Sequence, residues 1–291
     1  MNIQSSFIDH TFLDKTTLGN LYQNFDYFPF VKASTNSSVF VNTCHRVEFY
    51  YFENNPISFN IGNATSKSTN ETRETAIRLT HTMTGLNSVV LGETFISDQV
   101  FTYLGQENEL HYFFNKCLNI SNLARKKFNF YNYIDYNTIA LSLLPNADNL
   151  TLIGGGMLIK NLLPRTSDYK NITVITRNPK KFKKSINIDK KINVLKLDNY
   201  TIQQNTNCII ATTLDENYKS KIQKMMNTLL FSKIVDLSSI PLYELRSNKT
   251  NYVHMNDKAF LKKIKIGNSN FYKRVPEIKN FINTHLILGQ I

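Results

Sequence analysis

Short apolar runs that end at glycines or polar residues dominate the second half of the chain. Leu150-Thr151-Leu152-Ile153 predicts a buried strand that runs into Gly154-Gly155-Gly156, and residues 157–163 then have the apolar spacing of a helix. Similar runs predict further strands at residues 172–175, 208–211, 233–237 and 251–254. Because strands that alternate with helices are typical of a parallel sheet, residues 146–270 are predicted to form an α/β nucleotide-binding domain.

The first half of the chain mixes strand and helix patterns. Residues 38–41 and 49–52 predict two buried strands, and apolar positions at helical spacing predict helices at residues 16–25, 72–84, 95–104 and 110–128. We therefore expect an α+β catalytic and substrate-binding domain over residues 1–145, and an α/β fold class for the chain.

The last residues, 271–291, are predicted to form a short helical tail. Pro276 is expected to limit its helix to residues 277–288. One stripe of that helix is apolar and is expected to be buried against its own domain. The stripe consists of Ile278, Phe281, Ile282, Leu286 and Leu288.

Composition places the chain among soluble globular proteins. It has 291 residues, of which 42% are hydrophobic and 19% are charged. No apolar run is long enough to span a bilayer, and Met1–Ser6 lacks the basic start of an export signal, so a cytoplasmic protein without membrane association is expected. The three cysteines are scattered, which predicts neither a disulfide framework nor a metal site.

A formal net charge of +12 raises the question of a polyanionic partner. Basic patches that neutralise phosphates dominate affinity for nucleic acids, although a merely soluble basic surface explains the charge equally well. The basic residues gather at Arg125-Lys126-Lys127, at Lys180-Lys181 with Lys183-Lys184, at Lys190-Lys191, and at Lys262-Lys263 with Lys265.

The connection between the two predicted strands of the first half carries the most reactive side chains. Cys44, His45, Arg46 and Glu48 place a thiol, an imidazole, a guanidinium and a carboxylate within five consecutive residues. A nearby cation favours the thiolate, which is the form that attacks carbonyl carbon. Spacing alone favours a simpler interpretation, with Cys44 as a buried small side chain and Arg46 and Glu48 as a surface ion pair.

Three motifs together resemble the glutamyl-tRNA reductases. Thr43-Cys44-His45-Arg46-Val47-Glu48 resembles their Ser-Thr-Cys-Asn-Arg-Thr-Glu signature. Residues 85–93, Gly-Leu-Asn-Ser-Val-Val-Leu-Gly-Glu, are similar to their Gly-Leu-Asp-Ser-Met-Val-Leu-Gly-Glu segment, and Gln99-Val100 falls where that family has Gly-Gln-Val. The glycine-rich loop follows, so the resemblance covers nearly the whole chain.

The resemblance implies a reaction and a substrate. Cys44 would attack the ester that joins glutamate to its tRNA, and NADPH would reduce the thioester to glutamate-1-semialdehyde, a tetrapyrrole precursor. An aminomutase that accepts the labile aldehyde is an expected partner, and no other cofactor is implied. Arg46 would pair with the γ-carboxylate of the substrate.

The resemblance also implies substrate-binding roles for five other residues. Thr43 and Ser88 would donate hydrogen bonds to the substrate, and Glu48 would either fix Arg46 or hold the α-ammonium group. Glu93 and Gln99 would contribute as well. Their alternatives are a helix cap for Glu93 and a solvated helix face for Gln99.

The glycine loop and the second strand predict a Rossmann-like cofactor site. Gly154, Gly155 and Gly156 open a helix directly after a strand, where the backbone can approach a pyrophosphate. The third position of the G-x-G-x-x-G pattern is Ile159, which should loosen the packing of helix on strand. NAD sites place an acidic residue about twenty residues later. This chain has Thr176, Arg177 and Lys180 there, which favours NADPH.

Two departures separate the chain from that family. The family has a histidine seven residues before the glycine at position 85, where this chain has Arg78, so His81 or His45 is expected to supply the imidazole. The family also continues for roughly another hundred residues into a dimerisation domain. We therefore expect a short, divergent member that is monomeric or weakly dimeric.

Two functions stay open at this point. The first is an NADPH-dependent reductase of glutamyl-tRNA. The second is a tRNA-binding or regulatory homologue without reductase activity, which Arg78 and Ile159 favour. An ordinary dehydrogenase without an RNA partner agrees least with the charge and the cysteine motif.

Overall fold

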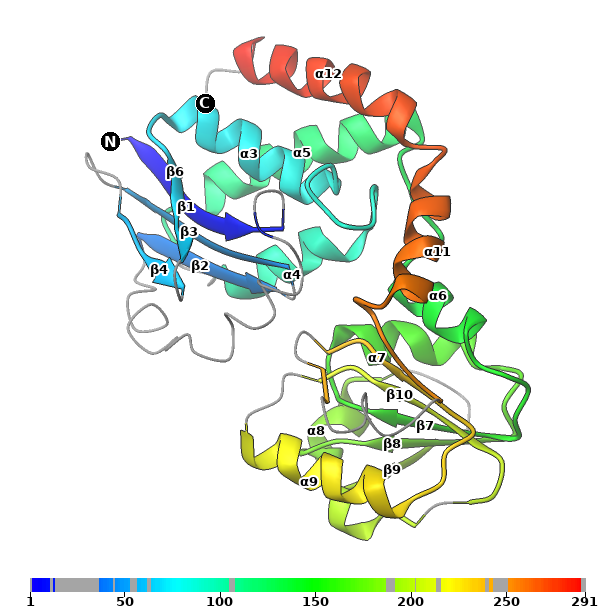
Figure 1. Cartoon of the computed structure of the whole chain (residues 1–291). Coiled ribbons are helices and arrows are strands. Elements are labelled where there is room, and N and C mark those ends of the chain that lie inside the picture. Colours follow the sequence, from blue (N-terminus) through cyan, green and yellow to red (C-terminus); the bar gives the residue numbers. More distant parts are fainter. Residues whose placement is uncertain are drawn as a thin grey trace. The chain divides into compact units, whose positions relative to one another are not determined.

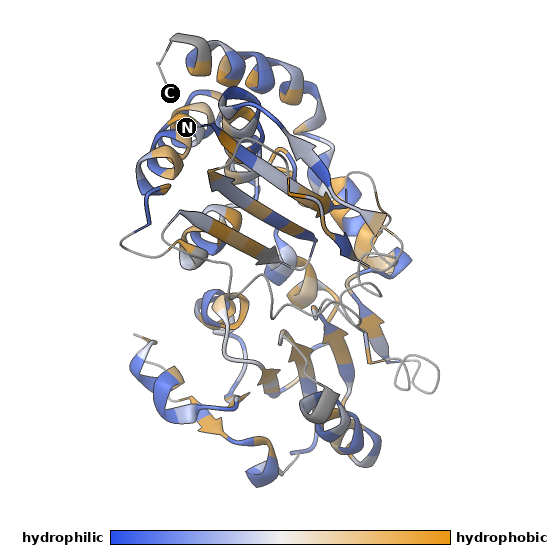
Figure 2. Ribbon diagram, turned by 90° about the vertical axis from the view of Figure 1, so that its left-hand side faces the viewer, coloured by the Kyte–Doolittle hydropathy of each residue, from blue (hydrophilic) through white to orange (hydrophobic). Residues whose placement is uncertain are grey.

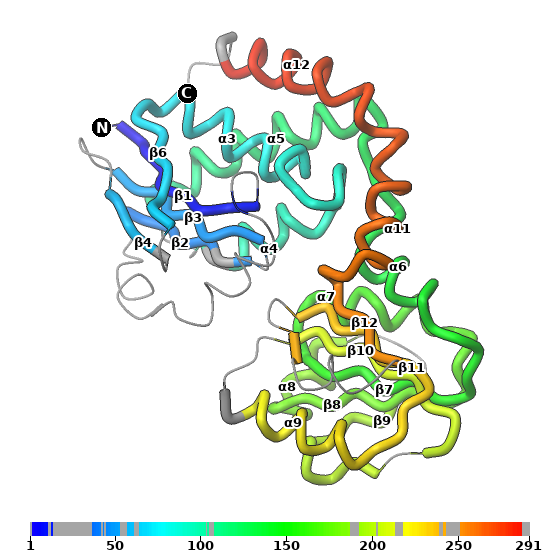
Figure 3. Tube along the Cα trace, viewed as in Figure 1, coloured from blue at the N-terminus to red at the C-terminus, as the bar shows by residue number. Residues whose placement is uncertain are grey.

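The structure is a computed structural model that describes residues 2–10, 13, 37–43, 45–52, 57–61, 64–104, 108–186, 192–201, 203–212, 216–238, 241–242 and 251–288. Cys44 and the helix predicted at residues 16–25 lie outside the described residues. The chain forms two compact units, Met1–Tyr133 with Ile264–Ile291, and Ile134–Lys263 (Figure 1 and Figure 3). The predicted boundaries at 145/146 and 270/271 are therefore displaced, and the tail belongs to the first unit.

An antiparallel sheet with the strand order β2-β3-β1-β6 lies in the first unit. Thr43 pairs with Arg46, so only residues 44 and 45 join β2 to β3. The strands predicted at residues 38–41 and 49–52 are confirmed within β2 and β3. The strands are β1 (Ile3–Asp9), β2 (Ser38–Thr43), β3 (Arg46–Phe52) and β6 (Lys67–Thr69), while β4 (Asn60–Ile61) and β5 (Ala64–Thr65) pair separately.

Helices of the first unit share one core with this sheet. The helix α3 packs on β1, α4 packs on β2, and α5 and α12 pack on α3. Leu79, Phe114 and Ile278 are fully buried in that core. The helices are α3 (Thr72–Thr84), α4 (Phe95–Tyr103), α5 (His111–Phe128) and α12 (Val275–Leu288), with α11 (Lys258–Asn268) and the turn η3 (Tyr272–Arg274) before α12.

Of the predicted apolar stripe on the tail helix, three residues are buried in this core and Phe281 packs against it partly buried, while the side chain of Leu288 lies outside the described residues. Ile278, Ile282 and Leu286 are buried against α3 and α5. The helix begins at Val275, two residues before the predicted start at residue 277. Pro276 therefore lies in the first turn, where the missing N–H leaves no helical hydrogen bond unmade.

A parallel sheet of six strands, in the order β12-β11-β10-β7-β8-β9, forms the second unit. The chain starts at the central strand β7, runs outward through β8 and β9, and then returns to the other side of β7 for the remaining strands. This is the strand order of a Rossmann-type sheet, so the predicted α/β fold is confirmed. The strands are β7 (Asn149–Ile153), β8 (Asn171–Ile175), β9 (Asn193–Leu195), β10 (Thr206–Ile210), β11 (Lys233–Asp236) and β12 (Tyr252–His254).

Helices and short turns connect these strands. They are α6 (Tyr136–Ser142), α7 (Met157–Leu162), η1 (Leu163–Arg165), α8 (Pro179–Lys184), η2 (Leu197–Asn199) and α9 (Glu216–Thr228). Figure 2 shows helices in which hydrophilic and hydrophobic residues alternate, as expected for helices that bury one face. Within the described part of the chain, no helix is long and apolar enough to cross a membrane.

Candidate functional site

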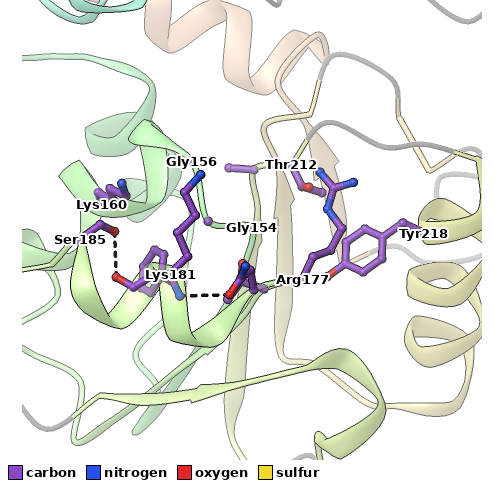
Figure 4. Close-up of a pocket in the computed structure, with 13 residues that line it drawn as sticks. Gly154, Gly156, Lys160, Arg177, Lys181, Ser185, Thr212 and Tyr218 are labelled. Carbon is purple, nitrogen blue, oxygen red and sulfur yellow. Dashed lines mark hydrogen bonds between the residues drawn. The ribbon is translucent and has the colours of Figure 1, made fainter. Parts of the chain in front are cut away.

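A pocket of about 350 Å³ opens where the strand order of the second unit reverses (Figure 4). Gly154 follows β7, Thr176 follows β8 and Ala211 follows β10, so the carboxyl ends of three strands meet there. In open parallel sheets this reversal point is where ligands bind. The described lining consists of Gly154, Gly155, Gly156, Lys160, Thr176, Arg177, Asn178, Lys181, Phe182, Ser185, Ala211, Thr212 and Tyr218.

The three glycines of the loop differ in what requires them. Gly154 has a φ of +135°, and a Cβ there would lie 2.1 Å from the carbonyl oxygen of Ala211. A Cβ on Gly155 would lie 2.6 Å from Oγ1 of Thr176. A Cβ on Gly156 would meet nothing within 4 Å. Protein packing therefore explains the first two glycines, whereas Gly156 leaves bare backbone at the pocket for a ligand to approach.

Positive charge dominates the pocket. Lys160 comes from α7, Arg177 follows β8 and Lys181 lies on α8, and no carboxylate is among the described lining residues. The guanidinium carbon of Arg177 lies 5.5 Å from the centre of the Tyr218 ring, and Figure 4 shows the two side chains next to each other. This arrangement suits an anionic ligand with phosphate groups and an aromatic base.

The structure gathers most, but not all, of the predicted cofactor residues. The three glycines, Thr176 and Arg177 line the pocket, whereas Lys180 does not. Lys181 and Lys160 take part instead, and sequence reasoning missed both as pocket residues. Lys160 lies one helical turn after Gly156, the cap residue of α7, and that spacing could have found it. Arg177 precedes α8, so helical spacing did not point to Lys181.

Ile159, at the third position of the glycine pattern, does not leave the helix loosely packed. Its side chain is fully buried, and its Cγ1 would lie 3.4 Å from a Cβ on Gly154. The larger side chain fills the space between helix and strand, so the loosening expected from the sequence is not seen.

In the first unit, the structure brings two of the sequence motifs together. The Arg46 side chain donates from Nη2 to the carbonyl oxygen of Asn87 at 2.6 Å, which ties β3 to the loop of residues 85–93. Its Nη1 lies 3.8 Å from Oε1 of Glu48. Arg46 and Glu48 are 1% and 0% exposed, so the alternative of a surface ion pair is wrong.

Several buried polar atoms at this contact have no hydrogen-bond partner among the described residues. Nε and Nη1 of Arg46 and Oγ of Ser88 are buried and have no hydrogen-bond partner among the described residues. Buried polar groups normally have such partners, and a ligand is one way to supply them. Three polar atoms without a hydrogen-bond partner, on a strand and a loop that touch, mark a candidate substrate site next in sequence to Cys44.

Arg78, which stands at the position of the family's histidine, is held by two carboxylates. Its Nη2 lies 2.5 Å from Oδ2 of Asp9 and 2.5 Å from Oε1 of Glu48. Its guanidinium carbon lies 3.2 Å above the ring of Phe7. Burial lowers the pKa of Arg78, but Glu48 and Asp9 outweigh it and raise that pKa above its ordinary value.

Both carboxylate oxygens of Glu48 have partners within the protein. Its Oε1 faces Arg78 and Arg46, and its Oε2 accepts a hydrogen bond from the hydroxyl of Tyr50 at 2.6 Å. Burial and the nearby Glu48 raise the pKa of Tyr50 well above its usual value, so the phenol stays protonated and donates. Of the two roles considered for Glu48, these contacts favour fixing the arginines over holding an ammonium group.

Two histidines, His10 and His45, contact each other. His45 is 9% exposed and meets His10 edge to face, with ring centroids 6.0 Å apart. The backbone N–H of His10 donates to the carbonyl oxygen of His45 at 3.2 Å. Sequence reasoning missed His10, and only its position directly after a strand that pairs with β3 pointed to it.

His81 lies on α3, three residues after Arg78. Burial, with smaller contributions from Lys279 of the tail helix and Arg78, lowers its pKa to about 4. It is therefore neutral at neutral pH. No contact among the described residues joins His81 to Arg46 or Ser88.

The loop that carries Ser88 is fixed from behind by Arg125. That guanidinium donates to the carbonyl oxygens of Gly92 at 3.1 Å, Met83 at 2.8 Å and Glu93 at 2.5 Å. Arg125 is 3% exposed, and burial lowers its pKa to about 10. Of the predicted basic cluster at residues 125–127, Arg125 therefore does not belong to the surface.

Asn268 of α11 holds the same loop from another side. It accepts from the N–H of Leu91 at 3.0 Å and donates to the carbonyl oxygen of Val89 at 2.9 Å. Gly85 ends α3 with a φ of +80°, so the loop leaves the helix in the left-handed conformation that favours glycine. The backbone around Ser88 is thus defined by contacts from three helices.

The remaining predicted substrate-binding residues are partly exposed. Thr43 pairs with Arg46 in the sheet and is partly exposed, and Glu93 and Gln99 are also partly exposed. The cap residue of α4 is Thr94, so the alternative role of Glu93 as a helix cap is wrong. Gln99 lies within α4. The position of Cys44 itself lies outside the described residues.

Comparison with known proteins identifies one curated relative. No protein-family model matches the chain. Protein nfe2 of Rhizobium meliloti is 30% identical over 229 residues, which span 72% of this chain and 74% of that protein.

Among solved structures, a chorismate mutase/shikimate 5-dehydrogenase fusion protein from Clostridium acetobutylicum is 18% identical. It matches with a TM-score of 0.33 over 52% of this chain and 62% of its own, a likeness too distant to bear on function. The sequence match to protein nfe2 has 30% identity and spans more than two thirds of both proteins, which is sufficient to assign a family. It belongs to the family of protein nfe2.

Proposed function

We propose that this protein is an NADPH-dependent reductase that converts glutamyl-tRNA to glutamate-1-semialdehyde through a thioester on Cys44. The observation that carries the proposal is the contact of Arg46 with the loop that holds Ser88. At this contact three buried polar atoms have no hydrogen-bond partner among the described residues, and Arg46 is two residues after Cys44 in the sequence. The motifs that resemble the glutamyl-tRNA reductases supply the identity of the substrate.

The residues divide the work of the first step. The thiolate of Cys44 attacks the ester carbonyl carbon, a C–S bond forms, and the C–O bond to the terminal ribose breaks, so that tRNA leaves as an alcohol after taking a proton. Arg46 binds the γ-carboxylate through its charge and through its donors, Nε or Nη1, that have no hydrogen-bond partner among the described residues. Ser88 donates to the bound substrate, and Glu48 holds Arg78 in place.

The pocket of the second unit supports the choice of cofactor. Lys160, Arg177 and Lys181 provide positive charge for phosphates, and Arg177 stands where NAD-selective sites have an acidic residue. NADPH, when bound, supplies the hydride that reduces the thioester. The bare backbone at Gly156 lets a pyrophosphate approach closely.

A second candidate function is a tRNA-binding homologue that does not reduce its ligand. One observation favours it: Arg78 replaces an imidazole at the family's position and is engaged in ion pairs with Asp9 and Glu48. His45 is then the imidazole next to Cys44 in the sequence, and His10 contacts His45.

Incubation with charged glutamyl-tRNA, with and without NADPH, distinguishes the two functions. Reductase activity predicts aldehyde formation that requires NADPH and is lost in Cys44→Ser. Cys117→Ser is the matched control, because Cys117 is 1% exposed and lies in the core of the same unit. Binding of the charged tRNA without any aldehyde, under conditions where both variants are folded, contradicts the reductase and supports the second candidate.

A further inference from the structure

Three charged side chains converge on the face of the sheet that carries Arg46. Asp9 is the cross-strand partner of Arg46 between β1 and β3, and Glu48 is two residues along β3, so both carboxylates share its face. Arg78 reaches the same place from α3. Arg46, Glu48 and Asp9 are each at most 1% exposed.

The two arginines do not share Glu48 equally. Nη2 of Arg78 lies 2.5 Å from Oε1 of Glu48, whereas Nη1 of Arg46 lies 3.8 Å from that same oxygen. Arg78 also forms an ion pair with Asp9. Buried carboxylates pair with the nearest cation, because an unpaired buried charge is costly. Without Arg78, therefore, Glu48 would have Arg46 as its cation, and Asp9 would share the sheet face of Arg46.

We infer that Arg78 is a positioning residue: by binding Asp9 and Glu48 it keeps them from neutralising Arg46, so that Arg46 offers its charge to an anionic group of the substrate. The inference deepens the proposed function, because it concerns the same site, but its physical content is the charge that Arg46 presents beside Cys44. Nε and Nη1 of Arg46 have no hydrogen-bond partner among the described residues, so either is a donor that could meet the anion.

Alkylation of Cys44 tests this without tRNA or nicotinamide. Iodoacetate and iodoacetamide both form a C–S bond and release iodide, but only iodoacetate carries the charge that Arg46 attracts. Cys117 and Cys208 are buried, and burial raises the pKa of both thiols, so labelling of native protein reports on Cys44. The iodoacetate-to-iodoacetamide rate ratio, divided by its value in denatured protein, measures the attraction.

The variants isolate the role of Arg78. In the wild type we expect a normalised ratio of about ten, as for one charged hydrogen bond. Arg78→Met with Asp9→Asn removes one charge of each sign and leaves Glu48 to pair with Arg46, so the ratio should fall to the denatured value. Adding Glu48→Gln removes that competitor and should restore the ratio. Arg73→Met, exposed on the same helix, is the control and should change nothing.

Several results overturn the inference. They are a ratio that survives Arg78→Met with Asp9→Asn, a ratio that Glu48→Gln fails to restore in folded protein, and a Cys44 that reacts with neither reagent. If thermal unfolding shows that Arg78→Met with Asp9→Asn is not folded, the single variant Arg78→Gln replaces it in the test. It still donates hydrogen bonds to the carboxylates but has no charge, so an unchanged ratio contradicts the inference. A protein that shows the expected ratios but makes no aldehyde loses the proposed reductase function and keeps this role of Arg78.

Discussion

Replacing Arg177 with serine should remove most of the preference for NADPH over NADH. Arg177 follows the second strand of the sheet, stands beside Tyr218, and faces a pocket without a carboxylate in its described lining. The 2′-phosphate is the group by which the two cofactors differ, and an arginine there adds a charged hydrogen bond. Such a bond contributes about 1.5–3 kcal/mol, and because Arg177 is exposed we expect the lower half of that range, or about 10–40-fold.

Binding of the two dinucleotides, followed by fluorescence of the reduced nicotinamide, measures this preference directly. Lys180→Ser is the matched control, because Lys180 is exposed, lies three residues away and does not line the pocket. Arg177→Ser should weaken NADPH binding and leave NADH binding nearly unchanged, whereas Lys180→Ser should affect neither. Equal losses for both cofactors in Arg177→Ser, or equal binding of both by the wild type, would refute the reasoning.

Three further predictions concern the loop that holds Ser88, the glycine loop and the buried histidine. Arg125→Met should lower the free energy of unfolding in urea by about 3–5 kcal/mol, because it leaves several buried carbonyl groups without a donor, while Lys126→Met on the exposed face should change it by less than about 0.5 kcal/mol. Gly154→Ala should destabilise the second unit, whereas Gly156→Ala should fold normally and weaken only dinucleotide binding, as thermal unfolding and a binding titration would show. The pKa of His81 is lowered to about 4 in the folded protein, so its contribution to stability, up to about 3 kcal/mol, is present above pH 6.5 and is lost as the pH falls towards 4. His81→Gln should flatten the pH dependence of unfolding in that window.

Each of these has an outcome that contradicts its basis. An Arg125→Met protein as stable as Lys126→Met would show that the carbonyl contacts contribute little. Dinucleotide affinity unchanged by Gly156→Ala would remove the argument that its bare backbone serves the ligand. A pH profile identical in wild type and His81→Gln would show that His81 is not desolvated in the native state.

Local sequence patterns predicted the elements that depend on neighbours in the chain. The helix at residues 72–84 was predicted with both ends in place, because Gly85 supplies the left-handed residue that terminates it. The strand that ends at Gly154 was found because an apolar run stops at a glycine. The tail stripe around Ile282 was expected to be buried, and its spacing was sufficient for that.

Contacts between distant parts of the chain decided the features that the sequence did not reveal. Asn268 holds backbone atoms of Val89 and Leu91, which lie 179 and 177 residues away, so no local pattern could assign it to that loop. Arg125 resembled a surface residue because it stands next to two lysines, yet its guanidinium is buried among carbonyl groups. These contacts also move the domain boundaries, since they tie the C-terminal residues to the first unit.

The partners of charged residues were the least predictable part of the site. Nothing in its spacing indicated that Arg78 would bridge Asp9 and Glu48, because these three residues come from β1, β3 and α3. The choice between Lys180 and Lys181 likewise depended on which side of α8 faces the pocket. Patterns in the sequence indicated the kinds of residue that the sites need, and tertiary packing determined which of them meet.

The most direct test of the central claim is the mass of the intact protein after incubation with glutamyl-tRNA in the absence of NADPH. Because the proposed mechanism stops at the thioester under these conditions, we predict one glutamyl adduct per chain. Peptide mapping should place the adduct on Cys44, and both hydroxylamine and added NADPH should remove it. Cys117→Ser should form the adduct as the wild type does, and Cys44→Ser should not. Charged tRNA that binds and stays intact without any adduct, or an adduct on another residue, would contradict the account.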